Sequence, residues 1–319
     1  MPTLVYLEDH EGELVPGSLG VLAKAAQLGG DVAAVVCGAG VKGLAAQAGR
    51  FGAARVHVAD DPALEAPLPQ PRVDVLAALV GDEGFDTVLF GASVLTADVA
   101  AGLAARLGAG LNWDLVDLEV RDGALVGKRP ALQDSVHVDV GWTGEPRLAL
   151  VRAGTFEPAE TGGEAEVQEV TVEIQDFSKR AVMVERAHAE SEGPSIEDAD
   201  VIVAGGRGLG EPDKFGLLEE LAKALGGAVA ATRAVVDAGW YPYPTQVGQT
   251  GKNVSPKLYV ACGISGAIQH KVGMQSSGTI VAINKDANAP IFEYADLGVV
   301  GDLHEIVPKL TELVRERKK

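Results

Sequence analysis

Residues 246–286 read QVGQTGKNVSPKLYVACGISGAIQHKVGMQSSGTIVAINKD. Two apolar, β-branched runs in this stretch, Leu258–Ala261 and Thr279–Ile283, each end in polar residues, which predicts two strands. Parallel strands bind ligands where they end, at the carboxyl edge of an open α/β sheet. Polar groups at this edge can bind a phosphate and a polar heterocycle, and they are poorly suited to a packed core. Such groups include bare backbone N–H groups, a hydroxyl, an amide and an imidazole. The first strand is followed by such a cluster: Gly263, Ser265, Gly266, Gln269 and His270.

The second half of the chain predicts a five-stranded, doubly wound parallel sheet. Strand-like runs at Val201–Ala204, Ala228–Ala231 and Gly298–Val300 join the two described above. Helical spacing covers Phe215–Leu225, closed by two glycines, and Leu303–Arg317. The intervening loop, residues 237–256, is rich in glycine and carries three prolines. Loops of this length in compact domains are usually functional or disordered.

The first half predicts a parallel-sheet α/β domain, because strand and helix periods alternate. The expected strands are Thr3–Leu7, Asp31–Cys37, Arg55–Val58 and Thr87–Phe90. The expected helices are Gly17–Gln27, Val41–Gly49, Val73–Val80 and Ala97–Leu107.

Between Asp114 and Ile174 the pattern changes to short alternating runs, which predicts an antiparallel extension or edge on the first sheet. These runs are Leu115–Arg121, Ala124–Val126, Ser135–Val140, Arg147–Val151 and Val167–Ile174. Two turn signals, Asp122-Gly123 and Thr143-Gly144, break them. The polar segment Arg186–Ala199 predicts a linker, so we expect domains at residues 1–188 and 189–319.

Composition excludes several classes of protein. The 319 residues carry a formal net charge of −18, which argues against nucleic acid or an anionic membrane surface as a partner. No apolar run is long enough to span a membrane, and no signal peptide is visible, so we expect no membrane insertion. The two cysteines, Cys37 and Cys262, have no metal-ligand or disulfide spacing, so we expect two buried thiols, no metal site and a reducing, cytoplasmic compartment.

Several motifs, in one order, resemble the FAD-binding domain of the electron transfer flavoprotein alpha subunit. They are GGRGL at 205–209, ATRAVVDAGW at 231–240, QVGQTGK at 246–252, ISGAIQH at 264–270 and INKD at 283–286. RAGTFEPAE at 152–160 extends the resemblance weakly into the first half. Several long motifs in a fixed order are far more specific than a single glycine pattern.

The resemblance implies one bound FAD and assigns roles to residues of the second domain. Arg207 would lie at the FAD, Arg233 would pack near the isoalloxazine, and Thr232 before it would contact the cofactor. The Thr250 hydroxyl would approach flavin N5, and His270 would donate toward flavin O2. Arg233, Thr250 and His270 would thus tune the flavin, with Arg233 and His270 stabilising the negative charge that reduction places near N1 and O2. The full set of expected FAD-binding residues is Arg207, Thr232, Arg233, Val247, Gly248, Gln249, Thr250, Ser265, Gly266, Ala267, Ile268, Gln269, His270, Asn284, Asp302 and Leu303.

The resemblance also implies an electron carrier and not a substrate-converting enzyme. Such a chain pairs with an electron transfer flavoprotein beta subunit as a heterodimer. It accepts electrons from flavin dehydrogenases such as the acyl-CoA dehydrogenases of fatty acid oxidation, and passes them to a quinone oxidoreductase. The compartment would be the cytoplasm, or the mitochondrial matrix in a eukaryote. Aromatic residues concentrated on the long loop, Trp240, Tyr241 and Tyr243, suggest a contact surface for the partner, or packing over the flavin or the domain's own core.

Two alternatives stay open on the residues alone. Gly38–Gly43 is a strict GxGxxG after a strand and before a helix, and Asp60 and Asp61 follow at the distance expected of a ribose-binding acid. This loop would suit an NAD-dependent dehydrogenase or a non-redox nucleotide-binding module. Arg233 could instead form a structural ion pair with an acid such as Asp237.

Overall fold

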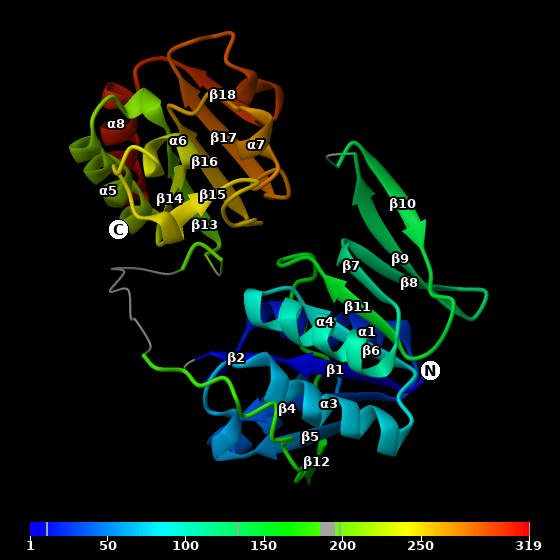
Figure 1. The fold of residues 1–319 in the computed structure, drawn as a ribbon. Coiled ribbons are helices and arrows are strands. Elements are labelled where there is room, and N and C mark those ends of the chain that lie inside the picture. Colours follow the sequence, from blue (N-terminus) through cyan, green and yellow to red (C-terminus); the bar gives the residue numbers. More distant parts are fainter. Residues whose placement is uncertain (11, 133, 186–194, 198, 319) are drawn as a thin grey trace. The chain divides into compact units, whose positions relative to one another are not determined.

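The computed structural model describes residues 1–10, 12–132, 134–185, 195–197 and 199–318 (Figure 1). The chain divides into two compact units, Met1–Ala187 and His188–Lys319, and each is described by itself. Most of the expected linker, residues 186–194 and 198, lies outside the described residues. Within the described part, no helix combines the length and the apolar character needed to cross a membrane.

The first unit is built on a seven-stranded sheet in which every pair of neighbouring strands is parallel. Its order is β12-β5-β4-β1-β6-β11-β7. The strands are β1 (Thr3–Leu7), β4 (Val32–Gly38), β5 (Arg55–Asp60), β6 (Thr87–Gly91), β7 (Leu111–Leu115), β11 (Arg147–Val151) and β12 (Glu166–Glu169). The central strands are near-continuous apolar runs because both faces of the sheet are covered.

Helices cover both faces of this sheet. One buried cluster includes side chains of α1 (Pro16–Leu28) and α2 (Ala45–Arg50), and a second, on the opposite face, includes those of α3 (Pro69–Glu83) and α4 (Val94–Leu107). Figure 1 shows α3 and α4 together on one side of the sheet. The start of α4 is fixed by a capping box between Ser93 and Thr96, which satisfies two N–H groups at the helix end. The predicted parallel α/β domain is therefore confirmed.

The predicted antiparallel extension is present as a sheet of its own, but it contains three of the five expected runs. The run Arg147–Val151 is instead β11, and the start of Val167–Ile174 falls in β12, and both strands are parallel members of the first sheet. Strands β8 (Asp117–Arg121), β9 (Ala124–Ala131) and β10 (Val136–Val140) pair in the order β10-β9-β8. Asp122 and Gly123 both have positive φ, 53° and 79°, as a two-residue hairpin turn of the primed type requires. The second expected hairpin, at Thr143-Gly144, is absent, because β10 and β11 belong to different sheets. A smaller antiparallel pair joins β2 (Asp9–His10) to β3 (Glu13–Leu14).

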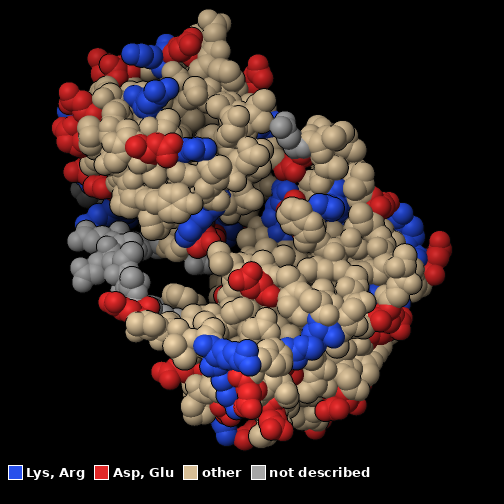
Figure 2. Space-filling model, in the orientation of Figure 1, with Lys and Arg blue, Asp and Glu red and all other residues tan. Residues whose placement is uncertain are grey.

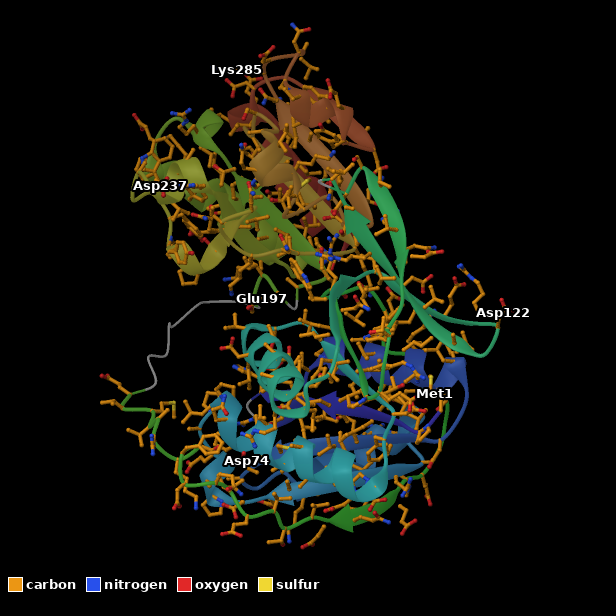
Figure 3. All side chains as sticks on the ribbon, turned by 45° about the vertical axis from the view of Figure 1, so that its right-hand side comes forward. Met1, Asp74, Asp122, Glu197, Asp237 and Lys285 are labelled. Carbon is orange, nitrogen blue, oxygen red and sulfur yellow. The ribbon has the colours of Figure 1, made fainter. Side chains whose placement is uncertain are left out.

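A buried carboxylate holds the outer layer of the first unit together. Asp74, on α3, accepts hydrogen bonds from the Arg106 guanidinium at 2.9 Å and from the Gln175 backbone N–H at 2.9 Å. Figure 3 marks Asp74 on α3, and its side chain is only 2% exposed. Because a buried charge is costly without partners, this pair fixes α4 and the segment at Gln175 against α3.

The second unit is a six-stranded parallel sheet of order β15-β14-β13-β16-β17-β18. The strands are β13 (Val201–Gly205), β14 (Ala228–Thr232), β15 (Gln246–Val247), β16 (Leu258–Cys262), β17 (Thr279–Asn284) and β18 (Leu297–Val300). The five predicted strands are present, and the long loop adds the two-residue β15. One face is covered by α5 (Phe215–Leu225), α6 (Arg233–Val236) and α8 (Leu303–Arg317), and the short α7 (Ile268–Lys271) follows β16.

Six single 3-10 turns complete the described elements. They are η1 (Lys42–Leu44), η2 (Pro62–Leu64), η3 (Arg207–Leu209), η4 (Pro212–Lys214), η5 (Tyr243–Thr245) and η6 (Pro290–Glu293).

Substitution of Leu218 on α5 tests how much the packing of helix against sheet stabilises the second unit. The side chain is fully buried against β13, so Leu218→Ala should lower the local free energy of unfolding by about 2–5 kcal/mol. Hydrogen exchange of the α5 and β13 amides measures that change within one unit of the full chain. Glu220→Ala on the same helix removes only an exposed ion pair with Arg315 and should change it by less than about 1 kcal/mol. Equal effects of the two substitutions would contradict this packing.

Candidate functional site

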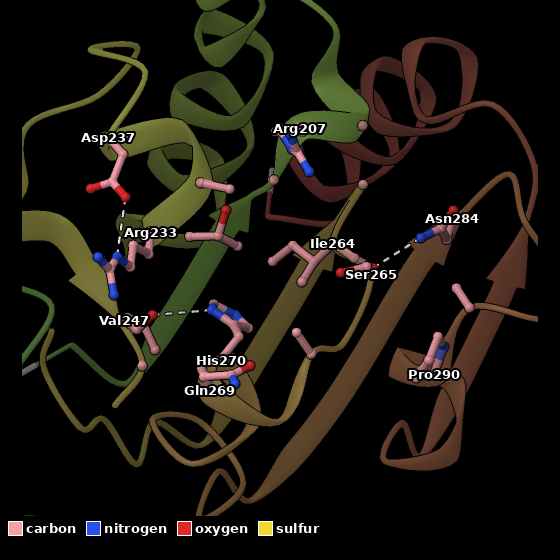
Figure 4. A pocket seen from close by; sticks show the side chains of 18 of the residues that line it. Arg207, Arg233, Asp237, Val247, Ile264, Ser265, Gln269, His270, Asn284 and Pro290 are labelled. Carbon is pink, nitrogen blue, oxygen red and sulfur yellow. Dashed lines mark hydrogen bonds and ion pairs between the residues drawn. The ribbon is translucent and has the colours of Figure 1, made fainter. Parts of the chain in front are cut away.

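A cavity of about 680 Å³ opens in the second unit at the carboxyl ends of β13, β14, β16 and β17. The chain runs from β13 to β14 on one side and returns to β16 on the other, so the cavity lies at the point where the strand order reverses, the usual ligand site of such a sheet. Its volume falls within the range of small-molecule and cofactor sites. Figure 4 shows the cavity from close by. The lining residues are Gly206, Arg207, Gly208, Thr232, Arg233, Ala234, Asp237, Val247, Gly248, Gln249, Thr250, Gly263, Ile264, Ser265, Ala267, Gln269, His270, Asn284, Asp286, Ala289 and Pro290.

Backbone-to-backbone packing of two loops forms the floor of the cavity. Gly206 N–H donates to the Cys262 carbonyl at 3.0 Å, and Gly208 N–H donates to the Gly263 carbonyl at 2.9 Å. A Cβ on Gly206 would lie 2.5 Å from the Gly263 oxygen, and one on Gly208 would lie 2.6 Å from the Gly263 Cα. Any larger residue at either position would therefore push the two loops apart.

The region around β13 and β16 presents groups suited to an anion. Arg207 begins the 3-10 turn η3 directly after β13, is exposed, and makes no ion pair among the described residues. Across from it, the backbone N–H groups of Ser265, Gly266, Ala267 and Ile268 donate to no group in the part of the chain that the structure describes. Unpaired N–H groups and a guanidinium that line one cavity can together bind phosphate oxygens.

Arg233 and Asp237 face the cavity from α6. The Arg233 Nε donates to the Asp237 carboxylate at 3.1 Å, so the ion pair considered for Arg233 is present (Figure 4). Both side chains are more than 60% exposed, and an exposed pair of this kind is worth at most about 1 kcal/mol. Arg233 can therefore leave Asp237 at little cost, and both residues line the cavity.

The loop after β15 closes the cavity against α7. Gln249 N–H donates to the Gln269 carbonyl at 2.7 Å, and Gly248 has a φ of 134°. A Cβ on Gly248 would lie 2.7 Å from that same carbonyl oxygen, so the close approach requires glycine. This contact places Val247, Gly248, Gln249 and Thr250 along one wall of the cavity.

His270 lies at the wall with both ring nitrogens bound inside the protein. Its Nδ1 is 3.1 Å from the Val247 carbonyl, which can only accept, so Nδ1 carries the proton (Figure 4). Its Nε2 is 3.0 Å from the Tyr259 hydroxyl, which therefore donates to it. Burial lowers the pKa of His270 to about 4, so the ring is neutral at pH 7. This differs from the expectation that His270 donates toward the flavin, because the only N–H of the neutral ring is bound to Val247.

Of the expected cofactor residues, four do not line the cavity: Gly266, Ile268, Asp302 and Leu303. Gly266 has a φ of 87°, and a Cβ there would lie 2.2 Å from the Ile291 nitrogen, so this glycine shapes the turn from behind. Asp302 caps α8 by accepting from the His304 N–H at 2.9 Å, and Leu303 is buried in the core. A cofactor role for Asp302 and Leu303 stays a prediction.

Asn284 lines the cavity, but both ends of its amide are bound. Its Nδ2 donates to the Ile264 carbonyl at 2.9 Å, and its Oδ1 accepts from the Asp286 N–H at 3.0 Å. The side chain therefore braces the loops after β16 and β17 against each other.

The structure adds lining residues that sequence reasoning left out of the site. Six of them lie inside the quoted motifs, which was a usable signal, whereas Ala289 and Pro290 lie outside every motif and carried none. The added residues are Gly206, Gly208, Ala234, Asp237, Ile264, Asp286, Ala289 and Pro290.

The GxGxxG loop of the first unit is folded around its own acids. Asp60 accepts a hydrogen bond from the Gly40 N–H at 2.7 Å, and Asp61 accepts from the Ala63 N–H at 2.7 Å. Both carboxylates expected at a ribose are thus used within the chain. Gly38–Gly43 leads into a single 3-10 turn and the short α2, so this loop is accounted for as a structural turn.

Comparison with known proteins gives matches to one family in both units. Residues 3–175 match the family pattern described as "Electron transfer flavoprotein domain", and residues 195–275 match the "Electron transfer flavoprotein FAD-binding domain". The chain is 45% identical over 320 residues to "Electron transfer flavoprotein subunit alpha" of Mycobacterium leprae, covering 99% of this chain and 98% of that protein. It is similar to proteins of the same name from Bacillus subtilis, 39% identical with coverage of 97% and 96%, and Thermoanaerobacterium thermosaccharolyticum, 38% identical with coverage of 98% and 98%.

The lowered pKa of His270 makes stability depend on pH. Between pH 6.5 and about 4 the unfolded chain binds a proton that the native ring does not, so stability is full above pH 6.5 and falls as the pH drops. At 1.36 kcal/mol per unit, the loss from pH 7 to pH 5 is about 2 kcal/mol. His270→Gln should remove this contribution. From pH 7 to pH 5, the unfolding free energy of its second unit should therefore fall by about 2 kcal/mol less than in the unmodified protein, as measured by hydrogen exchange without cofactor. His304→Gln, at an exposed histidine, is the control, and an unaltered pH slope in His270→Gln would refute this role.

Proposed function

The chain belongs to the electron transfer flavoprotein alpha-subunit family, and we propose that it carries electrons on one FAD held in the cavity of its second unit. The observation that carries this proposal is that Arg207 lines the same cavity as Ser265 and Ala267, whose backbone N–H groups donate to no group among the described residues. A pyrophosphate is a dianion whose oxygens accept many hydrogen bonds, so it matches this arrangement in both charge and donor number. The volume of about 680 Å³ and the glycine floor give an extended cofactor room beside the backbone.

The remaining walls suit the ring system of a flavin. Arg233 supplies a cation that its weak pair with Asp237 leaves available, and a guanidinium can stack on an aromatic ring or face a negative charge. The Thr250 hydroxyl would face flavin N5, following the family resemblance. His270 stays neutral and fixes the loop at Val247, so the charge that favours a reduced flavin comes from Arg233. FAD, when bound, supplies the redox chemistry, and the chain supplies binding, orientation and electrostatics.

A carrier needs partners, and we propose a beta subunit as the stable one. Flavin dehydrogenases, such as acyl-CoA dehydrogenases, would reduce the bound FAD, and a quinone oxidoreductase would oxidise it. The surface of the three-stranded sheet supports a stable partner, because Val120, Val136 and Val138 are 39–44% exposed. Trp113, on β7 of the first sheet, is 55% exposed and lies under the Arg129 guanidinium of β9. A group of exposed apolar residues such as the three valines is typical of an interface.

Of the three aromatic residues on the long loop, two pack within the second unit and one is exposed. Tyr241 stacks on Phe215 with ring centroids 4.3 Å apart, and Trp240 packs against the same core cluster. Both therefore stabilise the second unit itself. Tyr243 is 66% exposed and is the residue of the three that is open to a partner.

Arg207 tests the binding site. A hydrogen bond to a charged group contributes about 1.5–3 kcal/mol, and with the discount for solvent exposure Arg207→Ala should weaken FAD binding roughly tenfold. Arg207→Lys should weaken it less, because the charge remains. Flavin fluorescence titration measures the dissociation constants, with Arg315→Ala, at an exposed arginine of α8, as the control. Unchanged affinity in Arg207→Ala would remove Arg207 from the site.

Co-expression tests the partner. The chain produced with a beta subunit should sediment as a heterodimer whose flavin absorbance moves with the protein, whereas the chain alone should self-associate or lose flavin. Charged substitutions at Val136 and Val138, in the exposed sheet, should shift the complex toward free subunits more than the same change at the exposed Leu313 of α8. A chain that sediments alone as a monomer with full flavin content would argue against an obligate heterodimer.

A further inference from the structure

Gln246 is a buried polar residue directly behind the cavity wall. Its side chain is 2% exposed, and its Nε2 donates to the Thr250 hydroxyl oxygen at 3.2 Å. Its Oε1 is fully buried and accepts no hydrogen bond among the described residues. A buried amide aimed at one hydroxyl is costly to keep unless it serves the site that this hydroxyl faces.

The direction of this hydrogen bond follows from the cost of the alternative. If the amide were reversed, Oε1 would accept the Thr250 proton and both Nε2 hydrogens would be buried without an acceptor. Unpaired buried N–H groups are rarer in proteins than under-satisfied carbonyl oxygens. The amide nitrogen therefore faces Thr250, and since that nitrogen can only donate, the Thr250 proton is not used by Gln246.

The loop fixes the rest of Thr250 as well. Its carbonyl accepts from the Tyr243 hydroxyl at 3.2 Å, and Lys252 N–H donates to the Gln246 carbonyl at 2.7 Å across the turn. A Cβ on Gly251 would lie 2.3 Å from that same Gln246 oxygen, so the loop closes this tightly only with glycine there. Both oxygens of Thr250 thus accept hydrogen bonds from the loop, and its hydroxyl proton is left for the cavity that Thr250 lines.

We propose that Gln246 is a positioning residue that makes the Thr250 hydroxyl a hydrogen-bond donor to the ligand. The site would then favour a ligand atom with a free lone pair at that position over one that carries hydrogen. This inference rests on the proposed function, in which N5 of the oxidised flavin, an unprotonated ring nitrogen, lies at Thr250. Gln246 sets the direction of the hydroxyl without touching the cofactor.

The test compares FAD with 5-deaza-FAD, in which a C–H group replaces N5 and cannot accept a hydrogen bond. Both are bound to the flavin-stripped full chain, together with its partner subunit where the complex forms, and the two dissociation constants are measured by fluorescence. A net hydrogen bond of 0.5–1.5 kcal/mol predicts that the unmodified protein prefers FAD by roughly twofold to tenfold. General damage to the pocket weakens both ligands together and leaves this ratio unchanged.

The substitutions separate the inference from its premise. Thr250→Val should bring the ratio near one, Thr250→Ser should keep it, and Gln246→Met should lower it while the hydroxyl remains. Gln246→Leu gives a second apolar replacement of different shape, and Gln275→Met, outside the cavity, is the control. An unchanged ratio in both Gln246 variants, with a lowered ratio in Thr250→Val, would overturn the role of Gln246. A ratio that Thr250→Val leaves unchanged, with FAD still bound, would refute the placement of N5 at Thr250. Failure of the proposed function is a separate result: FAD affinity would then be the same in Arg207→Ala as in the unmodified protein.

Discussion

The close contact between the loops after β13 and β16 is the constraint on which the site depends. Gly206 and Gly208 meet Cys262 and Gly263 backbone to backbone, at hydrogen-bond distances of 3.0 and 2.9 Å. No side chain fits between them, so the chain can turn sharply out of both strands at the point where the strand order reverses. Arg207 lies between the two glycines and is therefore carried to the cavity edge by the backbone itself.

The charged side chains around the cavity are exposed, and the buried titratable side chain is neutral. Arg207 and Arg233 lie at the solvent side, where a cation costs little to maintain and attracts an anion. His270 is buried, and the Tyr259 hydroxyl and the Val247 carbonyl hold it as a neutral ring. The histidine thus joins β15 to strand β16, and the charged pair that remains open to solvent at the site is Arg233 with Asp237 (Figure 4).

The two cations in the cavity contrast with a chain whose formal net charge is −18. Figure 2 shows acidic and basic side chains interspersed over the face in view, without one large basic area. Local guanidinium groups can bind a phosphate despite the overall negative charge, because screening limits the reach of distant charges to about 8–10 Å.

The sequence by itself determined the fold class and most of the wall of the site. Strand and helix periods alternate, and parallel strands present the residues that follow them at one sheet edge, so the sequence alone places GGRGL, QVGQT and ISGAIQH together. The hairpin at Asp122-Gly123 was equally local, because those two residues favour positive φ.

Tertiary structure alone decided which contacts each side chain makes. Alternating runs between Asp114 and Val151 have the same period in an extension of the first sheet as in a separate sheet, so only packing placed β8, β9 and β10 apart. The GxGxxG at Gly38–Gly43 has the spacing of a nucleotide loop, yet Asp60 turns inward to Gly40. The partners of His270 and Thr250 depended on Tyr259 and Gln246, since a hydrogen bond is set by direction and distance in space, and neither is encoded in the spacing of a motif.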